Sequence, residues 1–164
     1  MKITDALLAE HLVFHNMFDH IEATASGIKK LEEIKTVAAL LESLLKSHSD
    51  TEDELFIGPL EHCFEQIGQR DAFLYEHQEI DGNLRLVQKA KQLKQARRLL
   101  LAAVAYSRQH FDKEERIVFP MAERILKSKT LLSLGQTWMD QRMRVASGVV
   151  ARTVNGKSEE ASRL

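Results

Sequence analysis

The chain of 164 residues contains one cysteine, two prolines and seven glycines. The single cysteine, Cys63, excludes an internal disulfide and a thiolate metal cage, so any bound metal must use nitrogen and oxygen ligands. Proline and glycine interrupt helices, and their scarcity, together with abundant Leu, Ala, Glu, Lys, Gln and Arg, favours an all-α fold. The length suits the core of one domain.

The sequence also has little net charge and no long apolar run. Its formal charge is -1, with acids and bases interspersed, so it lacks the basic stripe that binds nucleic acid. No apolar stretch approaches the roughly 20 residues that span a bilayer. Residues 1–14 contain Asp5, Glu10 and His11, where a signal peptide would be apolar. We therefore expect a soluble, cytoplasmic protein without nucleic-acid or membrane partners; a homodimer or a protein partner stays open.

Apolar residues recur at helical spacing over most of the chain. The pattern predicts helices over about residues 4–26, 31–58, 71–92 and 94–126, separated by turn residues. A shorter fifth helix over 131–145 would pack on them. The predicted architecture is an up-and-down four-helix bundle with a short additional C-terminal helix, spanning residues 1–147. Residues 148–164 are small and polar and are predicted to form a flexible tail.

Each predicted helix has polar residues in its buried stripe. Because residues four apart lie on one helix face, His48 with Glu52, and His110 with Glu114, can each present an imidazole and a carboxylate to one interior point. His11 and His77 add an imidazole from each remaining helix. The four stripes are Leu7, His11, Phe14, Phe18 and Ile21; Leu41, Leu45, His48, Glu52 and Leu55; Phe73, His77, Ile80, Leu84 and Val87; and Leu99, Ala103, Tyr106, His110, Glu114, Ile117 and Met121.

Six polar groups in one core indicate a metal site. An unpartnered buried polar group costs about 1–3 kcal/mol, whereas a domain is stable by only about 5–15 kcal/mol. Coordination removes that cost. Nitrogen and carboxylate ligands suit iron first, with manganese or zinc as alternatives, and two carboxylates able to bridge favour two ions.

The ligand pattern is also an internal repeat. Glu10-His11 recurs as Glu76-His77, and His48-x3-Glu52 recurs as His110-x3-Glu114. Each half of the chain therefore has a Glu-His pair followed by a His-x3-Glu pair. This order predicts a pseudo-twofold axis through the site.

These motifs, with the following Phe119-Pro120, resemble the hemerythrin-like, or HHE cation-binding, family over about four fifths of the chain. The resemblance implies a non-haem di-iron centre with an oxo or hydroxo bridge. The chain departs from the oxygen-carrying hemerythrins, which have a second histidine where this chain has Asp81, and an Asp five residues after the last histidine. It is closer to the branch with proteins of nitric-oxide stress and iron-centre repair, catalase-like bacterial members and an iron-sensing ubiquitin-ligase domain.

The outer ligands and the reaction stay open. Two six-coordinate irons offer about twelve positions, of which about ten are accounted for. His15, Asp81 and Tyr106 each lie one turn from a proposed ligand and are candidates for the rest. Glu54 and Glu115 neighbour the ligands and are expected in salt bridges or in contacts that support them, and His20 is expected at the surface.

The leading function is a di-iron protein that binds, senses or reduces dioxygen, peroxide or nitric oxide. The alternative is iron sensing or iron donation without turnover, and a third is a metal-free helical interaction module. Whether the protein is an enzyme stays open; if it is, we expect an oxidoreductase acting on peroxide or nitric oxide. No catalytic residue is assigned.

Overall fold

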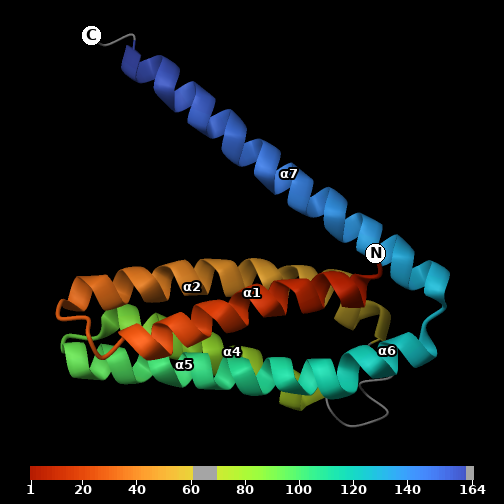
Figure 1. Cartoon of the computed structure of the whole chain (residues 1–164), viewed down its shortest axis with the longest axis horizontal. Helices are drawn as coiled ribbons and strands as arrows, with labels where there is room; N and C mark the ends of the chain where they lie inside the picture. Colours follow the sequence, from red (N-terminus) through yellow and green to blue (C-terminus); the bar gives the residue numbers. More distant parts are fainter. Residues whose placement is uncertain (61–69, 162–164) are drawn as a thin grey trace.

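A computed structural model describes the backbone of residues 1–60 and 70–161, and the side chains of residues 1–60 and 75–144. Cys63 lies outside both ranges. The described part is helical and contains no strand (Figure 1). Its elements are α1 (Ile3–Thr24), α2 (Leu31–Glu52), the π-helical segment η1 (Asp53–Ile57), α4 (Arg70–Lys89), α5 (Leu93–Lys113), the π-helical segment η2 (Glu114–Val118), α6 (Phe119–Ile125) and α7 (Ser128–Ala161).

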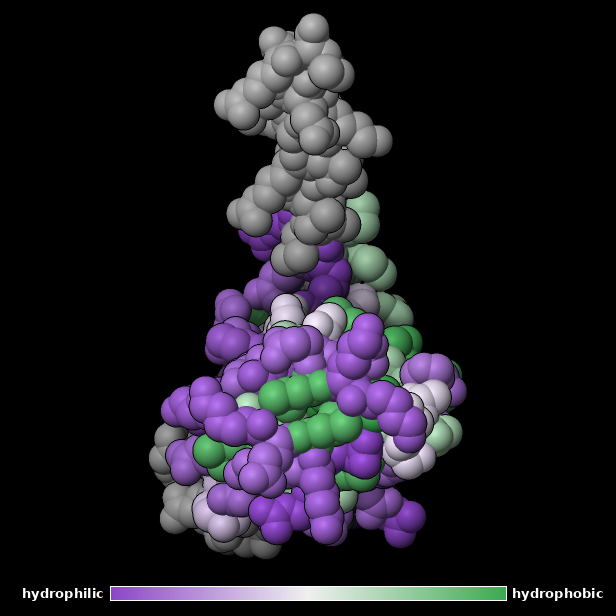
Figure 2. All heavy atoms as spheres, turned by 90° about the vertical axis from the view of Figure 1, so that its left-hand side faces the viewer, coloured by the Kyte–Doolittle hydropathy of each residue, from purple (hydrophilic) through white to green (hydrophobic). Residues whose placement is uncertain are grey.

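The long helices α1, α2, α4 and α5 lie lengthwise beside one another and form the predicted up-and-down bundle (Figure 1). Short connections join α1 to α2 and α4 to α5 at one end. That end is largely hydrophilic around a small apolar area, as Figure 2 shows. Partly buried side chains near these connections, Ile28, Leu31 and Leu93, pack against the core. The all-α prediction is confirmed.

Two apolar clusters fill the bundle, and the polar stripe residues lie between them along the helices. The larger cluster includes Phe14, Leu45 and Phe111, and the smaller includes Leu7 and Val118. His11 thus follows a residue of one cluster and precedes a residue of the other on α1. The apolar packing is continuous except at this polar layer, which is therefore shielded from water on both sides.

Every residue of the first two predicted stripes is buried. The prediction was wrong for two residues of the fourth stripe. Tyr106 is exposed, and Ser107 occupies the buried position instead. Ile117 is also exposed, and Val118 is buried. The π-helical turn of η2 explains the second case, because it contains more residues per turn than an α-helix and moves the inward position one residue along. Phe73 lies outside the described side chains.

Helix α7 extends well past residue 145, where the sequence pattern placed its end. Its first part packs against α1 and η1, and the rest points away from the bundle (Figure 1). Leu131 and Gly135 are buried at this contact; a Cβ on Gly135 would fall 2.9 Å from the backbone carbon of Lys2. The flexibility of residues 148–164 stays a prediction. None of the described helices combines the length and apolar character of a membrane span.

Candidate metal centre

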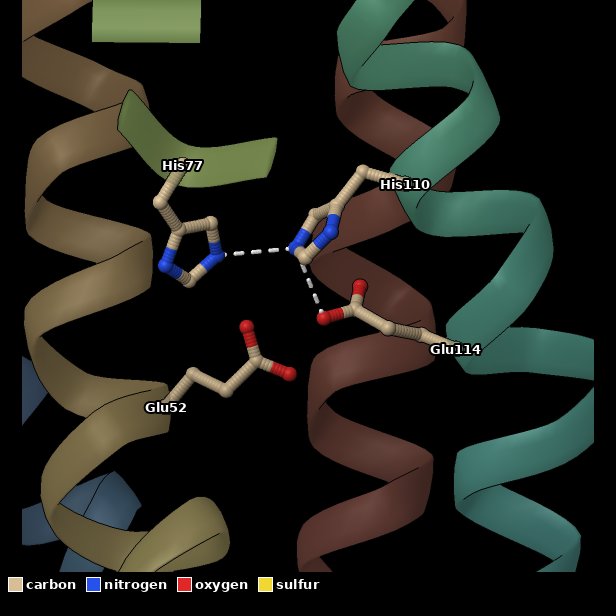
Figure 3. Close-up of side chains that lie close together, drawn as sticks. All are labelled: Glu52, His77, His110 and Glu114. Atoms are coloured by element: carbon tan, nitrogen blue, oxygen red, sulfur yellow. Dashed lines mark hydrogen bonds and ion pairs between the residues drawn. The ribbon is translucent and has the colours of Figure 1, made fainter. Parts of the chain in front are cut away.

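Four side chains from three helical regions point toward one another in the polar layer: Glu52, His77, His110 and Glu114 (Figure 3). One potential ligand atom of each lies within 4.8 Å of the others. The Nε2 atoms of His77 and His110 are 2.8 Å apart, and His110 Nε2 lies 2.9 Å from Glu114 Oε1. Nitrogen and oxygen donors at this spacing can surround one cation.

A second group lies directly beside the first and consists of His11, His48 and Glu114. The Nε2 atoms of the two histidines are 3.2 Å apart, and His11 Nε2 lies 3.2 Å from Glu114 Oε2. Glu114 thus presents one oxygen to each group. Glu52 is also near both, since its Oε2 lies 3.9 Å from His48 Nε2. The structure brings together all six residues that the stripes singled out.

Both carboxylates stand where an α-helix changes to a π-helical turn. Glu52 ends α2 and is followed by η1, and Glu114 begins η2 directly after α5. Such single turns recur at functional sites because they change which side chains face inward. The sequence signals these turns only indirectly, through the repeat that precedes each one.

Three histidines are held by carboxylates on the side away from the centre. His48 Nδ1 lies 2.8 Å from Glu10 Oε2, and His110 Nδ1 lies 3.0 Å from Glu76 Oε2. His11 Nδ1 lies 3.0 Å from Glu115 Oε1. An ionised carboxylate only accepts hydrogen bonds, so a neutral ring carries its hydrogen on Nδ1 and presents the Nε2 lone pair to the centre.

Sequence reasoning foresaw a supporting position for Glu115 but assigned no role to Glu10 or Glu76. The Glu-His repeat carried the signal: each glutamate supports a histidine of a neighbouring helix rather than the one beside it in sequence. Both glutamates are also paired with cations, Glu10 with Arg142 and Glu76 with Lys113.

These pairings keep the two supporting carboxylates charged. Burial opposes ionisation of Glu10, but hydrogen bonds from His48 and Arg142 lower its pKa below the ordinary value. Burial likewise opposes ionisation of Glu76, and His110 and Lys113 lower its pKa.

The three candidate outer ligands lie in neither group. The ring of His15 is about one third exposed, with Nε2 3.3 Å from Glu115 Oε1 and Nδ1 3.3 Å from Arg108. Asp81 is half-buried, and Tyr106 is exposed. His20 is exposed, as predicted.

The ionisable groups at the centre are buried close together and strongly shift one another's pKa values. Burial and the neighbouring charge of Glu114 raise the pKa of Glu52 well above its ordinary value. Burial opposes ionisation of Glu114, but the charge of His110 holds its pKa well below the ordinary range. Burial also opposes the charge of His110, yet Glu114 and Glu76 raise its pKa to about 9. Burial and His110 lower the pKa of His77 to about 4.

The carboxylate oxygens of Glu52 and Glu114 provide the test of fit. Both side chains are fully buried, and their oxygens contact only each other and the histidines of the two groups, with no donor of good hydrogen-bond geometry among the described residues. Glu114 forms ion pairs with His11 and His110 and faces the Glu52 carboxyl group. Unsatisfied buried carboxylates are costly, and a cation bound by these oxygens and the imidazole nitrogens would satisfy them. The residues present therefore fit a metal ion.

Comparison with known proteins agrees with this geometry. Residues 2–122 match the sequence model of the hemerythrin HHE cation-binding domain. The chain belongs to the hemerythrin HHE cation-binding family. Searches of curated proteins and of solved structures each found no match.

The hemerythrin match contains every predicted ligand and ends within α6, so α7 lies outside it. A cation-binding family and two buried clusters of nitrogen and oxygen donors agree on the general function. This hemerythrin domain is a metal-binding domain.

Proposed function

We propose that the domain holds two iron ions and uses them to bind, sense or reduce a small oxidant, namely dioxygen, peroxide or nitric oxide. The observation that supports two ions is that Glu114 belongs to both ligand groups. A carboxylate with two oxygens, each close to a different histidine, suits a position between two cations. The proposed ligands are His11, His48, Glu52, His77, His110 and Glu114.

His15 and Asp81 stand outside the proposed ligand set. His15 is engaged by Glu115 and Arg108 at the edge of the site, and Asp81 lies in neither group. Leaving these residues out leaves coordination positions for a small molecule.

Bound iron would supply redox chemistry and Lewis acidity at the centre. The protein's own contribution is to hold the imidazoles and to keep out bulk water. The ring of Phe111 stacks on that of His11, with centroids 3.8 Å apart and planes within 9°. Phe119 lies on the same imidazole, with centroids 5.4 Å apart. The aromatic contacts and Glu115 together fix the orientation of His11.

A surface pocket suggests how a small molecule reaches the centre. It has a volume of about 270 Å³ and is lined by residues of α1, α2 and α7, including Phe14, Leu44 and His48. Most of its lining is apolar, which suits an uncharged diatomic molecule better than a large polar substrate. Glu10 and Arg142 also line the pocket, so it lies on the outer side of His48, and we propose that a small molecule enters here and passes the His48 ring to reach the centre. We also propose that the protein acts in the cytoplasm.

Metal analysis and rapid kinetics test the proposal. Protein purified with iron should contain about two ions per chain and should lose stability on chelation. Less than about one iron or manganese per chain, with no effect of chelation, would contradict it. The reduced protein would then be mixed with each oxidant in a stopped-flow spectrometer.

The stopped-flow outcomes separate the candidate roles. A stable, reversible spectral change would indicate binding or sensing, and repeated consumption of peroxide or nitric oxide would indicate an oxidoreductase. Iron release to an acceptor, without either response, would favour iron donation instead.

A further inference from the structure

One side chain from outside the family match is connected to a proposed metal ligand through a single residue between them. Arg142, on α7, donates from Nε to Glu10 Oε1 at 2.8 Å. The other oxygen of that carboxylate lies 2.8 Å from His48 Nδ1. The order is therefore guanidinium, carboxylate, imidazole, with the proposed metal position at the far side of the ring.

Arg142 is itself held in place by several contacts. Its terminal nitrogens lie 3.2 Å from Ser47 Oγ and 3.3–3.4 Å from the Ser47 carbonyl oxygen, and its guanidinium lies 5.7 Å from the centroid of the Trp138 ring. The planar guanidinium can therefore bind Glu10 and α2 at the same time. Arg142 connects α7 to α1 and α2 beside the site.

The corresponding support in the other half of the centre is different. There the cation is Lys113, which lies three residues after His110 on the same helix and pairs with Glu76. That support needs no element outside the four-helix bundle. The His48 side, by contrast, depends on the docking of α7.

We propose that Arg142 is a positioning residue for the metal position at His11 and His48, so that docking of α7 sets how firmly that ion is held. It keeps Glu10 directed at His48 Nδ1, and through Glu10 it keeps the imidazole directed at the metal. The inference rests on the proposed di-iron function. Loss of such outer support commonly weakens metal binding by about 10–100-fold.

Docking of α7 depends on one face of the helix, which brings Arg142 to the site. Leu131, Gly135, Trp138 and Arg142 follow one another at spacings of three or four residues and so share that face. Gly135 has no room for a side chain, because a Cβ would fall within 3.0 Å of the Ile3 backbone nitrogen. A larger residue at 135 should displace α7 without changing any residue of the centre.

The test compares metal retention in the full-length, iron-loaded protein. Release of each ion to an excess of chelator is followed by absorbance in wild type, Arg142→Met, Arg142→Lys and Gly135→Val. We expect release of one of the two ions to be about tenfold faster in Arg142→Met and Gly135→Val, and partly restored in Arg142→Lys. Arg144→Met is the matched control on the same helix, because Arg144 contacts only the backbone oxygen of Asp140 among its described hydrogen bonds.

Two further measurements distinguish positioning from general destabilisation. The single tryptophan, Trp138, reports docking of α7 by how far a soluble quencher reaches it in the metal-free protein, a measure of access to the ring rather than of its contact with Arg142. Nitrogen-15 spectra of the same samples report whether His48 keeps its hydrogen on Nδ1. We expect Trp138 in Arg142→Met to stay as protected from the quencher as in wild type, and the two tautomers of His48 to become mixed. Gly135→Val should change both signals.

Double variants show which ion is affected. Arg142→Met should cause no further loss in a His48→Ala background, where that position is already impaired, but should add to His110→Ala. Unchanged release, or equal acceleration of both ions, in Arg142→Met would overturn the inference and leave the di-iron proposal intact. Wild-type protein that binds no metal would overturn both.

Discussion

The two halves of the metal centre have the same sequence motif but are supported differently. In each half a Glu-His pair on one helix faces a His-x3-Glu pair on the next, and the glutamate of the first pair supports the histidine of the second. In each half a π-helical turn lies at the glutamate that faces the centre, the inner glutamate: the turn follows Glu52 in one half and begins at Glu114 in the other. The repeat thus encodes ligands, their support and the local backbone together.

The two halves differ in how deeply the repeated residues are buried and in which residues they contact. The α1 histidine is fully buried, while its α4 counterpart, His77, is partly exposed. Of the inner glutamates, Glu114 pairs with histidines from both halves, whereas Glu52 lies farther from His48, at 3.9 Å. Glu10 takes its cation from α7 and Glu76 takes its cation from α5. Duplicated motifs can therefore hold two ions unequally.

The largest expected effect is a loss of metal affinity, and it should differ between Glu114 and Glu52. Glu114→Gln removes the charge that both ligand groups share, so affinity for both ions should fall about 100-fold or more. Glu52→Gln should mainly weaken the ion at His77 and His110, the group to which Glu52 belongs. Metal content after gel filtration, and titration by calorimetry, would measure this. Equal losses in the two variants would show that Glu52 and Glu114 are equivalent, contrary to the comparison.

A smaller effect should follow from removing one histidine of the α4–α5 half. His110→Ala should leave about one ion, held by His11 and His48, and remove the stabilisation of the other. A ligand at a thousand times its dissociation constant stabilises by about 4 kcal/mol, which is about 10 °C in Tm at this chain length.

His20→Ala is the control for His110→Ala. His20 is exposed on α1 and belongs to neither ligand group, so neither iron content nor Tm should change. Equal effects of the two substitutions on scanning calorimetry and metal content would refute the proposed ligand set.

The third prediction concerns the metal-free protein, in which a substitution at the centre should raise stability rather than lower it. Glu52 is fully buried beside the charged carboxylate of Glu114, and both burial and this charge raise its pKa, so Glu52 destabilises the fold when no metal is bound. Glu52→Met should raise the free energy of unfolding of the metal-free protein by about 1–3 kcal/mol while lowering its iron content.

Urea denaturation after complete chelation measures this stabilisation. Glu33→Met, at an exposed position of the same helix, should change the free energy by less than about 0.5 kcal/mol. A metal-free Glu52→Met protein that is less stable than wild type would mean that the carboxylate has a structural partner.

Much of this arrangement follows from the sequence alone. Helical periodicity predicted the bundle because the apolar stripes of the helices form its core. The same periodicity placed all six proposed ligands on the inward faces. His48 and Glu52 were recognisable because their spacing of four puts them on one face whatever the rest of the fold does. The prediction that His20 is exposed was also confirmed, because this residue falls outside the buried stripe of its helix.

The remaining features depend on contacts between distant segments. Ile117 was placed inward because an α-helical period was continued through what is a π-helical turn. Arg142 could not be linked to Glu10 because 132 residues separate them, and only the packing of α7 brings them together. Tyr106 was placed on the buried stripe, but small rotations of a helix decide between adjacent residues, and the core takes Ser107 instead.

The smallest expected effect tests the edge of the centre, where the α1–α2 half has a residue that the other half lacks. His15 lies one turn after His11, at the position that Asp81 occupies relative to His77. Its ring contacts Glu115 and Arg108 and is about one third exposed, so it is available to solvent rather than directed at the ligand groups.

His15→Ala should leave iron content at about two ions and change stability by less than about 1 kcal/mol, as for other exposed ion pairs. Loss of an ion in His15→Ala, but not in Asp81→Ala, would show that the α1–α2 half has one more ligand and fewer open positions. A small oxidant would then have to bind at the His77 side.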